Sequence, residues 1–336
     1  MKQLFSLLIL FVLIYFPACS KHSDSDIVWK FKTGYPMTGP PIVVKDRVFF
    51  GSDKFYCLNA ETGEKLWEFS TFSNVKTAAV YHNNRIYFQC GGLYCLEADT
   101  GKLVWEFWND QWADFPPVIT NKYAYVIVKK QLRCIDIKTG KKRWELKIGV
   151  QKPYVAASGN HVFLHFNNKF FCLNASDGKK VWELSSSKKP FFMSAAHSHL
   201  YYGYRNENTI YCLDEKTGNK RWECLLDSSL KSIIPEKNML FFSSNKVGSI
   251  EINTGKKIWE TDLKTETFMM PMQNFEKHIY PQTLKRRLFC LDADSGRLLW
   301  DMKIRARFPA ASKDYVYSRS INYFLYCLTP SKTKNN

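Results

Sequence analysis

Apolar and polar positions follow a short pattern that recurs at near-regular intervals along the chain. In the copy 94–107, an apolar run is followed by the polar stretch 99–102 and then by a second apolar run that contains Trp105. Strand-forming residues on both sides of a glycine turn predict a β-hairpin, because glycine adopts the positive φ that such turns require. Further copies of the hairpin occupy 55–69, 133–146, 171–184, 211–224, 248–260 and 289–302.

The hairpins mark a repeat with a period near 40 residues. Each turn glycine is followed four positions later by a tryptophan, and successive tryptophans from Trp67 to Trp300 are 38, 39, 38, 40, 37 and 41 residues apart. Between hairpins lies room for two more short strands, seen at 77–81 and 85–90. Four short antiparallel strands in each repeat predict the blade of a β-propeller.

The two ends of the repeat region contain complementary half-units. Residues 27–31, with Trp29, resemble a fourth strand, and residues 326–328 resemble a third strand without its fourth. Pairing them would complete an eighth blade and leave no open ring, whereas the alternative is an open array with unpaired ends. We therefore expect an all-β fold: a single eight-bladed β-propeller of four-stranded antiparallel blades over residues 27–329, closed by pairing of the N- and C-terminal strands, with a polar tail at 330–336.

The repeated tryptophans are predicted to be structural, because each occupies the same position of its blade and no copy stands apart from the others. We expect each to pack on the neighbouring blade, where a large aromatic ring buries much apolar surface. The set comprises Trp29, Trp67, Trp105, Trp144, Trp182, Trp222, Trp259 and Trp300.

The first residues read as an export signal. Lys2 precedes the apolar run 4–16, which is too short to span a membrane as a helix and has the length of a secretory signal core. The segment Phe16-Pro17-Ala18-Cys19 is similar to a bacterial lipobox, although Phe16 and Pro17 depart from the usual pattern. We expect residues 1–18 to be a signal peptide and residues 19–26 to be a lipidated Cys19 with a tether; the alternative is ordinary cleavage that leaves Cys19 a free thiol.

The repeat resembles a known family. The pattern from Ala98 through Gly101 to Trp105, repeated from Ala293 to Trp300, is similar to the PQQ-like (quinoprotein) β-propeller repeat. Together with the lipobox-like segment, it resembles the BamB-like propeller lipoproteins of outer-membrane β-barrel assembly. That resemblance implies a monomeric, lipid-anchored scaffold at the outer membrane facing the periplasm, with the β-barrel assembly machinery or another envelope protein as its partner and no nucleic acid.

Cysteine usage and charge add two expectations. Seven of the ten cysteines share one repeated position, so they would lie in different blades, too far apart to form disulfides. The formal net charge is +17, and many cations fall on the hairpin turns. A basic rim could attract anionic surface polymers, or it could be a set of solvated turns that keep the chain soluble. The rim candidates are Lys141, Lys142, Lys179, Lys180, Lys256 and Lys257.

No residues with the pattern of a catalytic site were found. The resemblance implies that quinone-dependent dehydrogenases use an adjacent Cys-Cys pair and a calcium site built by large insertions, yet this sequence has no adjacent cysteines, no CxxCH motif and only short segments between hairpins. Hydrolase, zinc-protease and phosphate-loop motifs are also absent. We therefore expect no enzyme activity, cofactor or metal, with a PQQ-dependent dehydrogenase-like enzyme as the alternative.

Aromatic residues in the segments between blades are the candidates for partner binding. Polar neighbours surround them, so exposed rings there would form an apolar surface of the kind that binds proteins. The alternative is that most of them fill gaps between blades as core. The candidates are Trp108, Trp112, Phe191 and Phe192.

Overall fold

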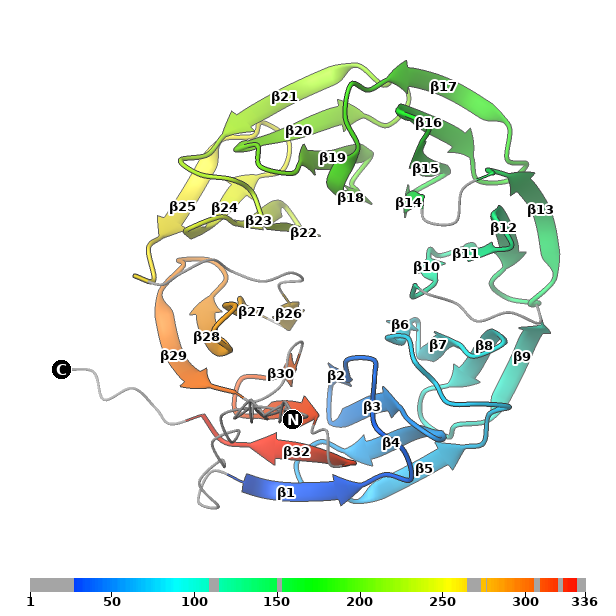
Figure 1. Cartoon of the computed structure of the whole chain (residues 1–336), viewed down its shortest axis with the longest axis vertical. Helices are drawn as coiled ribbons and strands as arrows, with labels where there is room; N and C mark the ends of the chain where they lie inside the picture. The colour runs from blue at the N-terminus through cyan, green and yellow to red at the C-terminus, as the bar shows by residue number, and fades with distance from the viewer. Residues whose placement is uncertain are drawn as a thin grey trace, which may run out of the picture.

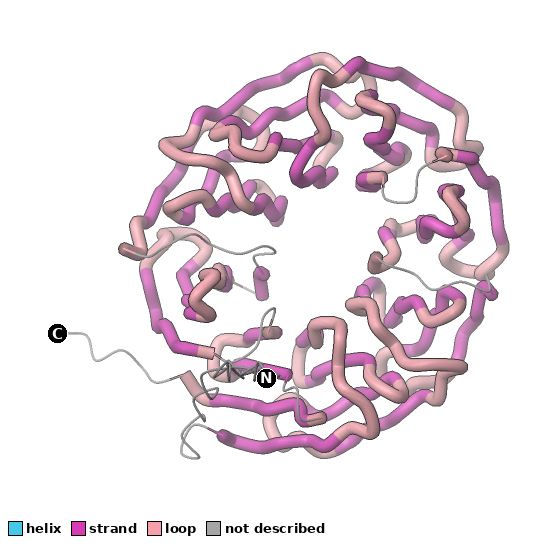
Figure 2. The backbone as a smooth tube through the Cα atoms, viewed as in Figure 1, coloured by secondary structure: helices cyan, strands magenta, loops and turns pink. Residues whose placement is uncertain are grey.

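The protein is an eight-bladed β-propeller. The computed structural model describes residues 27–108, 115–149, 153–264, 273–275, 277–304, 309–319 and 323–330. Eight four-stranded sheets surround a central axis (Figure 1), and every strand pair within them is antiparallel. No helix occurs among the described residues, which consist of strands joined by loops and turns (Figure 2), so none of them forms a helix that could cross a membrane. The predicted fold class is confirmed.

The blades are numbered in chain order. Blades 1 to 4 contain β2 (Ile42–Val44), β3 (Arg47–Gly51), β4 (Phe55–Asn59), β5 (Lys65–Phe69); β6 (Val80–His82), β7 (Arg85–Gln89), β8 (Gly92–Glu97), β9 (Leu103–Trp108); β10 (Val118–Ile119), β11 (Tyr123–Val128), β12 (Gln131–Asp136), β13 (Lys142–Lys147); and β14 (Tyr154–Ser158), β15 (His161–Phe166), β16 (Lys169–Asn174), β17 (Lys180–Ser185). Blades 5 to 8 contain β18 (Pro190–Ala196), β19 (His199–Tyr204), β20 (Thr209–Asp214), β21 (Lys220–Leu225); β22 (Ser232–Glu236), β23 (Met239–Ser243), β24 (Val247–Glu251), β25 (Lys257–Thr261); β26 (Gln273–Phe275), β27 (His278–Tyr280), β28 (Arg287–Asp292), β29 (Leu298–Lys303); and β30 (Ala310–Ala311), β31 (Val316–Arg319), β32 (Phe324–Leu328), β1 (Ile27–Lys32).

Blade 8 joins the two ends of the chain, as the sequence predicted. Its strand order is β1-β32-β31-β30, and β1 pairs antiparallel with β32 so that Trp29 lies opposite Cys327. In Figure 1 the blue β1 lies beside the red β32. The pairing supplies the outer strand that the C-terminal half-unit lacks, and so it closes the ring without an unpaired β32 edge.

The hairpin turns form because polar side chains bond the backbone and glycine accepts positive φ. In blade 3, the Asp136 carboxylate accepts hydrogen bonds from the Lys138 and Thr139 amides at 3.1 and 3.0 Å, and Gly140 adopts a φ of 70°. The Gly140 amide then donates to the Asp136 carbonyl at 2.9 Å. The carboxylate four residues before the glycine and the positive φ of the glycine therefore set the turn that the sequence pattern indicated.

A tryptophan from each of seven blades packs against the glycine turn of the next blade and donates a hydrogen bond to it. The Trp67 indole Nε1 donates to the Ala98 carbonyl at 3.1 Å, and its ring covers Gly101, where an added Cβ would lie 2.6 Å from the ring carbon Cδ2. Trp300 differs, because its indole donates to the Lys313 carbonyl of blade 8 at 3.3 Å. The other six tryptophans donate in the same way at 2.9 to 3.1 Å: Trp29 to the carbonyl of Ala60, Trp105 to Ile137, Trp144 to Ala175, Trp182 to Glu215, Trp222 to Ile252 and Trp259 to Ala293.

The core lies between the blades and holds the repeated cysteines. Each faces a tryptophan across the hairpin, as Cys134 faces Trp144, and all nine described cysteines are buried free thiols. Burial raises the pKa of the Cys134 thiol to about 12, so it stays protonated. The seven cysteines at the repeated position lie in seven different blades, as the sequence indicated.

The connections divide the propeller surface into two faces. The turn face carries the glycine turns and the turns between first and second strands, which touch where the Ala98 amide donates to the Asn84 carbonyl at 3.0 Å. The loop face carries the turns between second and third strands and the connections between blades, which touch where the Val75 amide donates to the Ser52 carbonyl at 2.8 Å. The glycine turns are 60–64, 98–102, 137–141, 175–179, 215–219, 252–256 and 293–297; the described loop-face connections include 33–41, 70–79, 115–117, 186–189 and 226–231.

Candidate partner-binding face

Two exposed aromatic rings meet on the loop face. Phe72, in the connection between blades 1 and 2, is 76% exposed, and Trp108, the last residue of β9, is 45% exposed. Their ring centroids lie 5.5 Å apart in an edge-to-face arrangement, beside Gly91, which has no side chain to cover them. Large apolar rings held together in water are typical of protein interaction sites.

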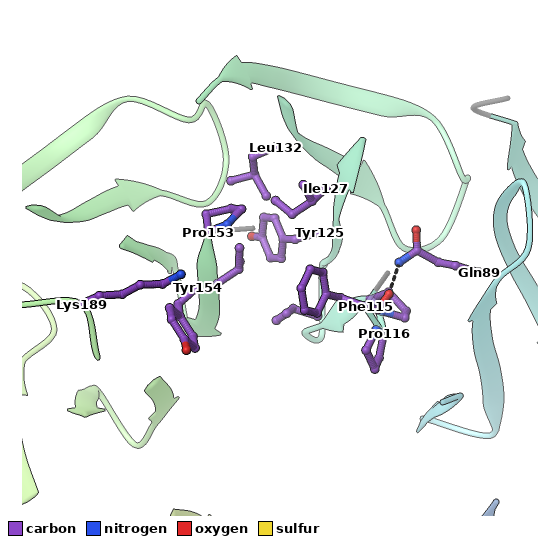
Figure 3. Close-up of a pocket in the computed structure, with 12 residues that line it drawn as sticks. Gln89, Phe115, Pro116, Tyr125, Ile127, Leu132, Pro153, Tyr154 and Lys189 are labelled. Atoms are coloured by element: carbon purple, nitrogen blue, oxygen red, sulfur yellow. Dashed lines mark hydrogen bonds between the residues drawn. The ribbon is translucent and has the colours of Figure 1, made fainter. Parts of the chain in front are cut away.

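A cavity of about 480 Å³ opens between blades 3 and 4 on the same face. In Figure 3, Phe115 and Tyr154 stand on opposite sides of it, with Tyr125, Ile127 and Leu132 between them. Its volume falls within the range of roughly 300–1,000 Å³ that is usual for ligand pockets. The cavity walls are thus almost wholly aromatic and aliphatic.

Short polar contacts and prolines hold the cavity walls. The Gln89 side chain of blade 2 donates from Nε2 to the Phe115 carbonyl at 2.7 Å, which ties the connection before β10 to the neighbouring blade (Figure 3). Pro116, Pro117 and Pro153 restrict the backbone at the starts of β10 and β14. The walls are therefore preformed by the blades on either side.

Cations lie over two aromatic rings of the loop face, Tyr154 and Phe191. The Lys189 ammonium lies 5.3 Å from the ring centroid of Tyr154, and the Arg205 guanidinium lies 4.8 Å from that of Phe191. Such cation–π contacts hold the charged groups beside the rings. The loop face around blades 3 to 5 therefore combines aromatic surface with positive charge.

The structure separates the four predicted aromatic candidates. Trp108 is exposed and Phe191 is half-buried, whereas Trp112 lies outside the described residues. The expectation that Phe192 is exposed was wrong, because it is 8% exposed and packs with Leu226 and Leu230 in the core between blades 5 and 6. The cause is that β18 already starts at Pro190, so Phe192 is its third residue and, like Pro190, is buried.

The six predicted rim lysines are all exposed, but half of them are paired with glutamates. Lys142, Lys180 and Lys257 lie 2.7 to 3.1 Å from Glu145, Glu183 and Glu260, the carboxylates that follow the tryptophans. Lys179 lies 3.6 Å from Asp177, while Lys141 and Lys256 form no ion pair with any described carboxylate. Local pairing therefore weakens the positive rim that the sequence indicated.

The described residues do not fit a quinone or calcium site. No group of three or more His, Cys, Asp or Glu side chains among them is arranged to hold a metal ion. The repeated tryptophans, which would have to supply a platform, are engaged with the next blade. Cys19, the predicted lipidation site, lies outside the described residues.

The sequence did not predict the cavity, and its described lining includes none of the four aromatic candidates. Tyr125, Ile127 and Leu132 read as ordinary alternating strand residues, and Lys189 reads as one cation in a polar loop. Only their meeting across two blades reveals the cavity. A possible signal was the clustering of Pro116, Pro117 and Pro153 at the starts of two neighbouring blades.

Comparison with known proteins gives both family and fold. The family described as outer membrane protein assembly factor BamB matches residues 20–223, 131–277 and 243–332. BamB from Moraxella catarrhalis is similar in structure, with a TM-score of 0.60 and 15% identity over 90% of this chain and 99% of that chain. No curated protein matches the sequence.

Two further solved structures share the architecture. The computationally designed protein Ika8 has a TM-score of 0.73 and 13% identity over 90% of this chain and 99% of its own. The quinohemoprotein alcohol dehydrogenase ADHIIG from Pseudomonas putida HK5 has a TM-score of 0.60 and 13% identity, over 94% of this chain and 78% of its own. At such low identity, these similarities establish the fold and not the activity.

Proposed function

Because the chain belongs to the family of the outer membrane protein assembly factor BamB, we propose that it is a non-catalytic scaffold of the cell envelope that binds protein partners through its loop face. The proposal rests on one observation: the loop face presents the exposed pair Phe72 and Trp108. An apolar pair of this size in water favours burial against a partner. The partner we propose is a component of the outer-membrane protein assembly machinery.

The place where the propeller begins supports a membrane-tethered arrangement. Ile27, the first residue of β1, pairs with Leu328 at the turn-face end of blade 8, while Lys32 pairs with Phe324 at the loop-face end. A tether over residues 19–26, attached to a lipidated Cys19, would therefore leave from the turn face. We propose that the anchor holds the protein at the outer membrane on the periplasmic side and leaves the loop face free for partners.

Site-specific photo-cross-linking in intact cells tests the proposal. A photoreactive phenylalanine analogue replaces Trp108 on the loop face, and in a matched control it replaces Thr139 on the turn face. We expect an adduct with an outer-membrane assembly component from position 108 and none from position 139. Adducts from position 139 alone, or none from position 108 while the protein is folded and exported, would overturn it.

The dehydrogenase-like alternative has the shared fold as its support. It requires a quinone and calcium to bind, for which the described side chains offer no matching set. Adding pyrroloquinoline quinone and calcium to the purified protein should leave its melting temperature and visible absorbance unchanged. A thermal shift with quinone absorbance, or alcohol oxidation with an artificial electron acceptor, would favour the enzyme.

A further inference from the structure

We propose that the cavity between blades 3 and 4 is a docking site for an acidic segment of a protein partner, which inserts one large apolar side chain between flanking carboxylates. The inference rests on the proposed scaffold function and specifies the chemistry of its partner. Three features of the described residues support it: the shape of the cavity, the apolar character of its walls and the charge around it.

The cavity is a space that the chain leaves unfilled at one blade interface and fills at another. Ile127, the fifth residue of β11, lines the cavity. The fifth residue of β19 is Gly203, and there Phe192 and Leu230 occupy the space so closely that an added Cβ would lie 2.7 Å from each. The described residues of blades 3 and 4 that line the cavity include no such pair, which leaves room there for an apolar side chain from outside.

The walls favour an apolar side chain over a polar one. Phe115, Val118, Tyr125, Leu132 and Val155 line the cavity from two blades. Phe115 is 42% exposed, so part of this surface faces water in the free protein. A phenylalanine or leucine of a partner would remove that surface from water, which is the main favourable contribution to association.

The described residues around the cavity carry positive charge. Lys189 lines the cavity, and Lys129 and Lys130 form the turn between β11 and β12, the strands that carry the lining residues Ile127 and Leu132. All three lysines are exposed, and none forms an ion pair with a described carboxylate; the described lining contains no acidic residue. Carboxylates next to the inserted side chain would complement this charge, whereas cations there would be repelled.

Short peptides test the docking site with the purified full-length mature protein. The probe is acetyl-Gly-Glu-Phe-Glu-Gly-amide, and its two controls replace the phenylalanine by alanine or both glutamates by lysine. We expect isothermal titration calorimetry to detect binding of the probe at low salt and at least about fivefold weaker binding of each control, since both the ring and the charges contribute. Equal binding of all three peptides would overturn the proposal.

Variants locate the binding. Lys189→Glu should weaken binding of the probe peptide about fivefold relative to Lys179→Glu, which makes the same charge change on the turn face. Val155→Trp, checked for folding by circular dichroism, should fill the cavity and abolish binding. Equal effects of the two lysine variants would overturn the site.

A small-molecule ligand tests whether the occupant of the cavity is a protein segment or a small carboxylic acid. If 4-phenylbutyrate binds in a Lys189-dependent way and no peptide does, the cavity takes a small carboxylic acid and the proposal of a protein segment fails. The peptide experiment uses no envelope partner, so its failure is distinguishable from a failure of the cross-linking at Trp108. A loop-face adduct without peptide binding would preserve the scaffold function and remove only this docking site.

Discussion

Replacing one turn glycine by alanine tests how the blades are held together. Gly101 has a φ of 72°, and a Cβ there would lie 2.6 Å from Cδ2 of the Trp67 ring. Gly101→Ala therefore combines two penalties: a left-handed backbone carrying a side chain and a steric clash with a buried ring. Gly149 provides a matched control, because its φ is 71° and no atom lies within 4 Å of the added Cβ.

The expected magnitudes follow from these two environments. Gly149→Ala should cost only the left-handed backbone, about 1–2 kcal/mol. Gly101→Ala should cost the same plus overpacking against Trp67, which adds about 1–3 kcal/mol. The difference between the two variants measures the contact between blades 1 and 2 without the backbone contribution.

Urea unfolding followed by circular dichroism measures both variants, and a double-mutant cycle assigns the cause. Trp67→Ala alone should cost about 3–5 kcal/mol, because it removes a large buried ring. In that background, Gly101→Ala should lose its steric penalty and resemble Gly149→Ala. Equal destabilisation by Gly101→Ala and Gly149→Ala in the native background would refute the proposed lock.

Three further predictions follow from the described contacts. Burial lowers the pKa of His165, so the unfolded chain takes up a proton at this residue at a higher pH than the folded protein does. The free energy of unfolding should therefore fall as the pH drops below about 6.5, by at most about 1.4 kcal/mol per pH unit. Urea titrations at pH 7.5 and 5.5 should show a smaller pH dependence for His165→Gln. Deleting residues 1–32 should leave β32 unpaired and cause aggregation, seen by size-exclusion chromatography, whereas deleting residues 1–26 should leave a monomer. Lys142→Ala should change the free energy of unfolding by less than about 1 kcal/mol, with a smaller effect at high salt, because its pair with Glu145 is exposed.

The sequence was sufficient to predict the fold because seven blades repeat the same local chemistry. A polar side chain four residues before each turn glycine and a tryptophan four residues after it set the hairpin and its contact with the neighbouring blade. The two half-units at Trp29 and Cys327 were complementary, so their pairing could be inferred before the structure was known.

The candidate site was only partly predictable, because it depends on features that do not repeat. The cavity requires residues of β10, β11 and β14 to face each other across two blades, and no single segment reveals that arrangement. The burial of Phe192 depends on where β18 begins, which its polar neighbours did not indicate. Lys142 and Lys180 pair with Glu145 and Glu183 three residues later in the same strand, next to a β-bulge that regular strand alternation does not predict.

The two faces of the propeller are under different physical constraints, and this difference explains where a binding function can reside. On the turn face, each glycine turn must keep its positive φ and accept the ring of the preceding blade, as Gly101 accepts Trp67, so its conformation is tied to the stability of the ring. Among the described residues, the loop-face connections repeat only a hydrogen bond within the blade, such as that from the Ser186 amide to the Asn168 carbonyl at 2.8 Å, and they differ in length and composition between blades. Residues such as Phe72, Trp108 and Phe115 can therefore remain exposed there without loss of the interblade lock, which makes the loop face the surface where partner specificity can vary while the fold stays fixed.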